Sequence, residues 1–166
     1  MAHPNQPLQI TRFQPTDEPG VINVILPIQQ AEFGIPITAA DQPDLRAIGE
    51  FYQQGNGDFW VAKAGEEVVG TIGLKDIGEG RAALRKMFVA QAYRGAAYGT
   101  ASRLLTTLLE AARARGVQQI LLGTTAQFLA AHRFYEKHGF HEVAKHNLPA
   151  SFPLMAVDSK FYALTL

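Results

Sequence analysis

The stretch LRKMFVAQAYRGAAYGTASRLLTTLL, residues 84–109, carries the strongest structural pattern in this chain. Its first part, Leu84 to Val89, ends in three apolar residues and predicts a buried strand. Its last part predicts an amphipathic helix, because the leucines from Leu104 onward have the one-sided spacing of a helix that packs on a sheet. The apolar run Gln119 to Gly123 then predicts a second strand, and a strand, a helix and a strand in this order favour a parallel pair.

The turn between the first strand and the helix, Arg94 to Thr100, has the composition of a phosphate-binding turn. Gly95 and Gly99 let the backbone turn sharply and let a ligand approach it closely. Free N–H groups and the dipole at the start of the helix favour an anion. The spacing resembles motif A of the GCN5-related N-acetyltransferases (GNAT), Gln/Arg-x-x-Gly-x-Gly/Ala. Ala97 stands where glycine is usual in that motif, which requires a negative φ at this position.

A second segment, AHRFYEKHGF at residues 131–140, is similar to motif B of the same family, Ala-x-x-Phe-Tyr-x-Lys-x-Gly-Phe. Gly139 and Phe140 fit a glycine C-cap with its apolar contact. The pattern Thr124-x-x-Gln127 fits a capping box and predicts that this helix begins near Thr124. Phe128 stands where relatives often have an asparagine, so the polar contact of that asparagine must be absent or supplied by another group.

The remaining elements agree in order with this family. The patterns predict a strand at 8–13, a helix from about residue 16 to 33 that Pro27 kinks or splits, a second helix that begins at Asp41 and Asp44, strands at 59–63 and 68–74, and two final strands after residue 143. The resemblance implies an α/β GNAT (acyl-CoA N-acyltransferase) fold, with a mixed sheet of about six to seven strands flanked by about four helices. We expect residues 1–7 to form a loose arm and 8–166 to form a single domain.

Composition excludes several classes of function. Lysine plus arginine and aspartate plus glutamate balance at 15 each, which argues against nucleic acid or an anionic membrane as the main partner. The chain contains 0 cysteines, so it can form neither a disulfide nor a cysteine–acyl intermediate, and any acyl transfer should be direct. With no signal segment and no long apolar run in the sequence, we expect a cytoplasmic protein.

The resemblance implies acetyl-CoA as co-substrate and assigns residues to its parts. The pantetheine arm would lie along the backbone of Met87, Phe88 and Val89. The pyrophosphate would lie on the turn amides, from Arg94, Gly95, Ala96, Ala97, Tyr98, Gly99 and Thr100. Tyr135 matches the family position of the general acid that protonates the departing thiolate. A cluster of basic residues is expected around this turn: Arg81, Arg85, Lys86, Arg94 and Arg103.

We therefore predict an N-acetyltransferase that acts on a primary amine of a small molecule or amino acid. In relatives the acceptor lies against two loops, which correspond to residues 33–41 and 146–155 and are mostly apolar here. The general base stays open among Glu32, Asp76 and Glu79. No metal is expected, because His138 and His141 lack further ligands. A homodimer stays open, as do two other functions: a non-catalytic acyl-CoA sensing module and an unrelated nucleotide-binding domain.

Overall fold

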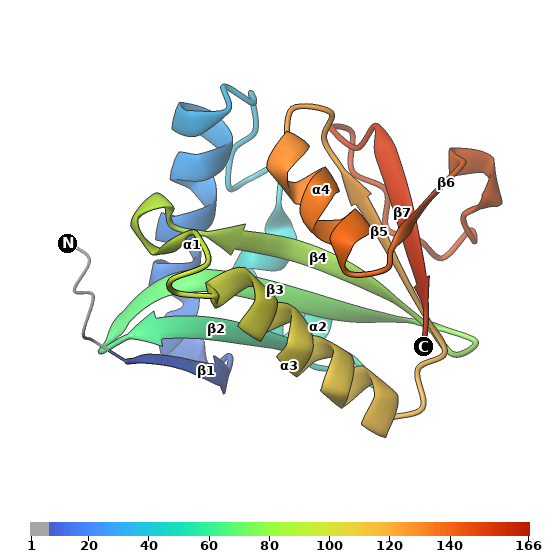
Figure 1. The fold of residues 1–166 in the computed structure, drawn as a ribbon, viewed down its shortest axis with the longest axis horizontal. Helices are drawn as coiled ribbons and strands as arrows, with labels where there is room; N and C mark the ends of the chain where they lie inside the picture. Colours follow the sequence, from blue (N-terminus) through green and yellow to red (C-terminus); the bar gives the residue numbers. More distant parts are fainter. Residues whose placement is uncertain (1–6) are drawn as a thin grey trace.

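The computed structural model describes residues 7–166, which form a seven-stranded sheet with helices on both faces (Figure 1). The arm predicted at residues 1–7 lies outside the described residues except for Pro7. The strands are β1 (Leu8–Arg12), β2 (Asp58–Ala64), β3 (Glu67–Gly78), β4 (Arg81–Val89), β5 (Gln119–Thr124), β6 (His141–Val143) and β7 (Lys160–Thr165). The α-helices are α1 (Glu18–Pro27), α2 (Ile48–Tyr52), α3 (Thr100–Ala114) and α4 (Leu129–Lys137). The predicted mixed sheet and α/β fold are confirmed.

The sheet has the order β1-β2-β3-β4-β5-β7-β6, and only β4 and β5 are parallel neighbours. This pair is joined by α3, as predicted from residues 84–122. It is short: the register runs from Arg81–Gln119 to Ala83–Leu121 and stops there. Beyond Ala83, β4 keeps β3 on one side, but within residues 7–166 no strand pairs with its other edge. The two strands therefore separate toward their carboxyl ends.

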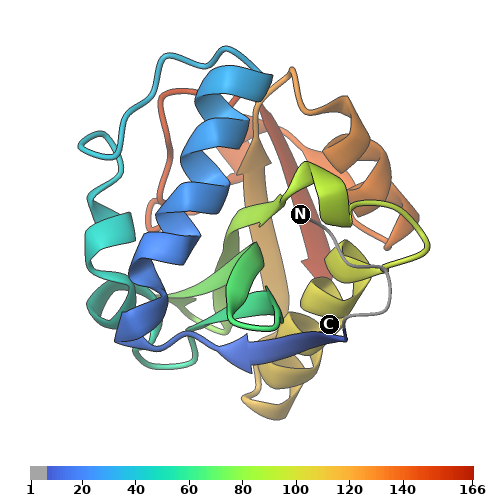
Figure 2. The same cartoon turned by 90° about the vertical axis from the view of Figure 1, so that its left-hand side faces the viewer.

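The helices are divided between the two faces of the sheet. The buried leucines of α3, with Tyr135 and Phe140 from the α4 region, form one core cluster with the strands. The apolar residues of α1 and α2 form a second cluster on the opposite face, around Phe59 and Val61. Figures 1 and 2 show α3 and α4 on one side of the sheet and α1 on the other. In the described part of the chain, no helix has both the length and the apolar character needed to cross a bilayer.

Pro27 splits the first helical segment, as predicted. The α-helix ends at Pro27, and one π-helical turn, Ile28–Glu32, follows it. Proline has no N–H to donate in the helical ladder, and the next turn has the wider spacing, with Phe33 N–H donating to the carbonyl of Ile28 at 3.1 Å. The second predicted helix is shorter than expected, because Ala47, whose φ of −145° and ψ of 44° lie outside the helical region, divides it into a 3-10 turn (Pro43–Arg46) and α2.

The predicted start of the last helix near Thr124, with its capping box, is wrong. Thr124 is the last residue of β5, where it pairs with Lys160 and accepts a hydrogen bond from Ser159 N–H at 3.0 Å. The chain must leave the sheet before it can form a helix, so α4 begins at Leu129 after Phe128, which makes no side-chain cap. The predicted C-cap is confirmed, because Gly139 has a φ of 94° directly after the helix.

A bulge in β4 changes the direction of its side chains. Thr71 of β3 pairs with Phe88, whereas Gly73 pairs with Arg85, so β4 holds one residue more than β3 between these pairs. Lys86 takes up the extra length with a φ of 55°, which is uncommon outside glycine. The buried hydroxyl of Thr71 donates to the Lys86 carbonyl at 2.6 Å. This carbonyl therefore has a hydrogen-bond partner although the strand ladder is irregular here.

Replacing Thr71 should show what holds this bulge. Thr71→Val keeps the shape of the side chain but leaves the buried Lys86 carbonyl without this donor, so we expect a loss of about 1–3 kcal/mol in the free energy of unfolding. The control, Thr71→Ser, keeps the hydroxyl and loses one methyl group. Urea unfolding with an unchanged m-value measures both. A larger loss in Thr71→Ser than in Thr71→Val would show that methyl packing, and not the hydrogen bond, matters here.

Candidate functional site

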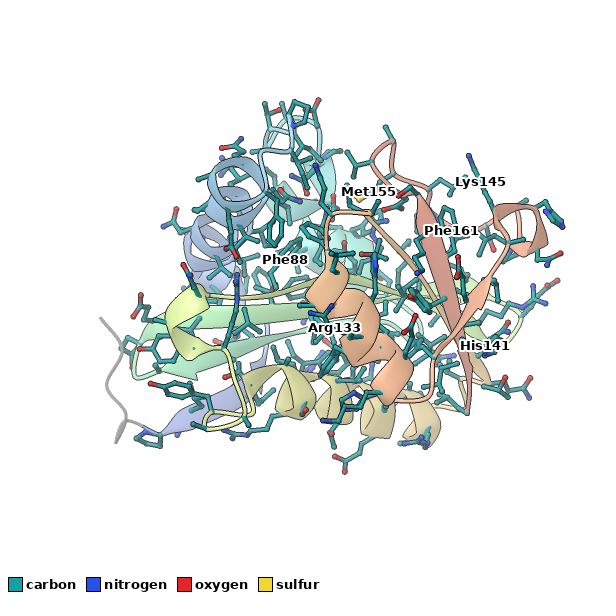
Figure 3. All side chains as sticks on the ribbon, turned by 45° about the horizontal axis from the view of Figure 1, so that its top comes forward. Phe88, Arg133, His141, Lys145, Met155 and Phe161 are labelled. Atoms are coloured by element: carbon teal, nitrogen blue, oxygen red, sulfur yellow. The ribbon has the colours of Figure 1, made fainter. Side chains whose placement is uncertain are left out.

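A cavity of about 390 Å³ lies where β4 and β5 separate. This is within the range of roughly 300–1,000 Å³ that ligand pockets have. Its walls come from the part of β4 beyond Ala83, the π-helical turn after α1, the end of β5, the start of α4 and the loop before β7. Phe88 and Met155, both labelled in Figure 3, contribute from β4 and from that loop. Elements that are distant in the sequence thus meet around one space.

The β4 side of this cavity is a strand edge without a partner strand. Met87, Phe88 and Val89 all line the cavity. The ladder with β5 ends at Ala83, so within the described residues the backbone groups on this edge are not used by β5. A strand edge of this kind can pair with an extended ligand that carries amides. The three residues predicted to hold the pantetheine arm therefore lie together on a suitable edge.

Two glycines with positive φ shape the turn between β4 and α3. Gly95 has a φ of 101° and Gly99 a φ of 60°, and a Cβ at either position would meet no atom within 4 Å. Their role is therefore conformational. Ala97 is not among the residues with positive φ, so its Cβ is tolerated.

Not all seven predicted turn amides are available to a ligand. The amides of Arg94, Tyr98 and Gly99 already donate to backbone carbonyls inside the turn. Among residues 7–166, no acceptor is found for the amides of Gly95, Ala96, Ala97 and Thr100. Four free N–H groups beside a helix N-terminus suit an anion.

Arg94 is held by protein groups. Its guanidinium makes a two-pronged ion pair with Glu32, in which the Nη2–Oε2 distance is 2.8 Å, and its Nε donates to the carbonyl of Val89 at 2.9 Å. The hydrogen bonds from Arg94 hold the pKa of Glu32 below its usual range. Glu32 is therefore a poor candidate for the general base that accepts a proton. The ion pair also ties the end of the π-helical turn to the start of the phosphate turn.

The predicted basic cluster around the turn is wrong. Arg85 and Lys86 are buried and line the cavity. Arg103 donates to the carbonyl of Leu8 at 2.9 Å. Arg81 is the first residue of β4, at the end of the strand opposite the turn. The turn therefore depends on its amides and the helix dipole more than on side-chain charge.

Tyr135 lies in the wall of the cavity, 6% exposed. Its hydroxyl donates to the sulfur of Met87 at 3.7 Å, which is a weak hydrogen bond, and within the described chain it makes no other. Burial raises the pKa of Tyr135 above its ordinary value, so the phenol is protonated at neutral pH. A proton donor therefore stands next to the free edge of β4.

A buried polar cluster, which the sequence patterns did not reveal, surrounds Arg85 and Lys86 of the cavity wall. Lys86 Nζ donates to Gln42 Oε1 at 2.5 Å, and Arg85 Nε donates to the hydroxyl of Tyr52 at 3.1 Å. That hydroxyl donates in turn to Asp44 at 2.5 Å. Burial lowers the pKa of Lys86 to about 8.

Asp158, in the loop before β7, is a cavity residue that the sequence analysis missed. Its Oδ2 accepts a hydrogen bond from Met155 N–H at 3.1 Å, which fixes the carboxylate. Burial raises the pKa of Asp158, as is useful in a proton acceptor. No local pattern marks this residue, because its place depends on the pairing of β7 with β5.

The two other carboxylates considered as the base lie outside the cavity. Asp76 accepts hydrogen bonds from Asn56 N–H at 2.9 Å and Gly78 N–H at 2.9 Å near the β3–β4 hairpin. Glu79 lies in that hairpin, at the opposite end of β4 from the cavity. Throughout residues 7–166, no three side chains of the metal-binding types come together.

Phe128, at the position of the family asparagine, belongs to an aromatic wall. Its ring meets Phe33 edge-on with centroids 4.6 Å apart, and Phe88 at 6.1 Å. All three rings line the cavity. This wall connects the π-helical turn to the start of α4 across the gap between β4 and β5, and it makes that part of the cavity apolar.

Comparison with known sequences points to one family. A sequence model described as the acetyltransferase (GNAT) family matches residues 22–140. The chain is 32% identical over 151 residues to the uncharacterized N-acetyltransferase YjgM of Escherichia coli K12, covering 84% of this chain and 85% of the relative. It is 33% identical over 132 residues to N-acetylaspartate synthetase of Xenopus tropicalis, covering 77% of this chain and 48% of that protein. The chain thus spans about half the length of such vertebrate relatives.

Solved structures agree with this assignment. An acetyltransferase of the GNAT family from Staphylococcus aureus Mu50 matches with a TM-score of 0.92 at 36% identity, over 96% of this chain and 99% of the other. An acetyltransferase from Streptococcus agalactiae matches equally well, with a TM-score of 0.92 at 30% identity, over 97% and 99%. The fold, the two motifs and these relatives together show that the chain belongs to the GNAT family of acetyltransferases.

Proposed function

We propose that this chain transfers the acetyl group of acetyl-CoA directly to a primary amine of a small molecule or an amino acid. The observation that carries the proposal is the free edge of β4 beside a cavity whose wall includes the protonated phenol of Tyr135. A relative that is named N-acetylaspartate synthetase has an N-acetylated amino acid in its name, which supports this class of acceptor.

Two parts of the co-substrate, the pantetheine arm and the pyrophosphate, fit two different parts of the site. The pantetheine arm carries amides that can pair with the backbone edge at Met87, Phe88 and Val89. The pyrophosphate is an anion that the free amides around Gly95 and Thr100 can bind. A structural neighbour from Thermoplasma acidophilum was crystallised in complex with coenzyme A, and although at 18% identity it shows the shared fold alone, a CoA ligand is compatible with that fold.

The chemistry removes two protons from the acceptor nitrogen and adds one to the departing thiolate. The acceptor ammonium loses a proton, and its nitrogen then attacks the thioester carbonyl carbon. A C–N bond forms, the C–S bond breaks, and the amide nitrogen gives up its second proton. Tyr135 donates a proton to the departing thiolate and recovers one from solvent. Donors on the bulged part of β4 stabilise the developing oxyanion. The chain has 0 cysteines, which agrees with direct transfer.

A non-catalytic acyl-CoA sensor is the second candidate, because Ala97 and Phe128 depart from the family pattern. Neither residue disturbs the site. Ala97 adopts a φ that permits its Cβ, and Phe128 forms part of the apolar wall. Release of free CoA thiol from acetyl-CoA in the presence of a panel of primary amines tests the enzyme directly. Binding of acetyl-CoA without release by any amine would favour the sensor.

The turn should bind acetyl-CoA through its backbone, so bulk at Gly99 should weaken binding. Gly99→Val forces a branched side chain into a left-handed residue at the start of α3. The matched control is Gly116→Val, because Gly116 has a φ of 81°, has equally open surroundings and lies at the other end of the same helix. Both variants should lose similar stability in thermal unfolding, but only Gly99→Val should lose acetyl-CoA affinity in calorimetry. Equal affinities in the two variants would exclude this turn as the pyrophosphate site.

Removing the Tyr135 hydroxyl should slow the chemical step. Tyr135→Phe loses only a weak bond to Met87, so the melting temperature and the acetyl-CoA affinity should change little, while kcat falls by about 10²-fold, the low end for a general acid. Tyr162→Phe is the control: its ring lies 6.0 Å from that of Tyr135, but its hydroxyl donates to Glu136. The control should retain kcat. An unchanged kcat in Tyr135→Phe, with chemistry shown to be rate-limiting, would contradict the proposed role.

A further inference from the structure

The bulge in β4 brings two cations to the same side of the sheet. Successive side chains of a regular strand point to opposite faces. Here both Arg85 and Lys86 reach the face covered by α1 and α2, where Arg85 contacts Tyr52 and Lys86 contacts Gln42. The exposed fractions of the two side chains are only 11% and 2%. Two buried cations therefore stand side by side in the wall of one cavity.

The protein does not fully compensate the charge of Lys86. Asp44 is 3.9 Å from both cations, which is beyond hydrogen-bonding distance, and it already accepts the short hydrogen bond from Tyr52. The ammonium of Lys86 has three N–H donors, but its contacts within the described residues are one strong acceptor, Gln42 Oε1, and the sulfur of Met155 at 3.6 Å. Burial lowers the pKa of Lys86 even though Asp44 and Asp158 act in the opposite direction, so these two carboxylates leave part of its charge uncompensated.

A carboxylate lies next to these cations, on the other side of Met155. The sulfur of Met155 contacts Lys86, and its backbone N–H holds Asp158. Arg85 ties the same loop to β4 by donating to the carbonyl of Pro153 at 2.9 Å. The cavity thus presents two positive groups and one negative group close together, bordered by the apolar rings of Phe33, Phe88 and Phe128. This is the complement of a molecule that carries an anion, a cation and an apolar part.

We propose that the acceptor is an amine with a carboxylate close to it, as in an α-amino acid, and that Lys86 and Arg85 bind the carboxylate while Asp158 receives the ammonium. This inference rests on the proposed acetyltransferase function and narrows its acceptor class. A bound carboxylate supplies the strong acceptors that Lys86 lacks. Asp158 then stands beside the ammonium and can accept the proton that must leave before the nitrogen attacks.

The CoA phosphates do not account for this pair of cations. The proposed pyrophosphate site is the turn around Gly95 to Thr100, after the end of β4, whereas Arg85 and Lys86 lie within the strand. Gly95 to Thr100 do not line the cavity that contains the two cations. The anion that meets Lys86 should therefore belong to the acceptor.

Matched amines test the inference on the wild-type protein. Leucine and isopentylamine differ only in the carboxylate, and so do phenylalanine and phenethylamine. Leucinamide keeps the size of leucine but has a neutral amide in place of the carboxylate. We expect kcat/KM to be about 30-fold or more higher for each amino acid than for the amines that lack its carboxylate, the cost of removing one member of a buried charge pair. Equal values within each pair would overturn the inference and leave the acetyltransferase function standing.

Two lysine variants identify the residue responsible. Lys86→Met should raise KM for leucine by about 30-fold or more and leave the KM of isopentylamine and the Kd of acetyl-CoA unchanged. Lys75→Met is the control, because Lys75 on β3 donates to the carbonyl of Phe51 and lies outside the cavity. It should change none of these values. An equal effect of Lys86→Met on both amines would mean that Lys86 is structural and would contradict the proposed carboxylate site.

A binding measurement decides the matter even if no amine is turned over. Calorimetry with N-acetyl-leucine and N-acetyl-isopentylamine, each in the presence of CoA, should show binding of the acid, its loss in Lys86→Met and weaker binding of the neutral compound. Equal binding of the two, or no binding of the acid, would overturn the carboxylate site. Binding of the acid without any turnover of amines would instead count against the acetyltransferase function alone.

Discussion

The early separation of β4 from β5 creates the site of this protein. Three residue pairs join the strands, and within residues 7–166 no strand pairs with this edge of β4 beyond Ala83. Tyr135 of α4 packs into the core that contains Leu84 and Val89, so one face of the gap is closed by protein and the other faces the loops of the acceptor side. A free strand edge inside a molecule is normally a liability. In the proposed function, it supplies hydrogen-bonding groups to the extended pantetheine arm.

The bulge at Lys86 is a second feature on which the candidate site depends. A lysine with positive φ inside a strand costs free energy, and such strain persists where the surroundings enforce it. Thr71 holds the Lys86 carbonyl, Gln42 holds its ammonium, and Arg85 anchors the loop before β7. The proposal for the acceptor depends on this bulge, because it brings Arg85 and Lys86 to one face of the sheet.

Sequence patterns predicted most of the fold and the part of the site that is local in the chain. The strand, turn and helix around Gly95 and Gly99 follow from residues that are neighbours in sequence, and the structure confirms these elements. The patterns missed Asp158, because only the pairing of β7 with β5 brings it to the cavity. They also misplaced Lys86, which they assigned to the phosphate turn, since no local signal marks a bulge at a lysine. The helix-capping pattern that begins at Thr124 gave a wrong helix start, because Thr124 is the last residue of β5.

A crystal structure of the protein with coenzyme A would test the central claim most directly. The account predicts electron density for the pantetheine arm along Met87, Phe88 and Val89, in the gap between β4 and β5, with its thiol next to the hydroxyl of Tyr135. The pyrophosphate should lie on the amides of Gly95 to Thr100. Density for coenzyme A anywhere else, or a β4 edge that remains free while the ligand is bound, would contradict it.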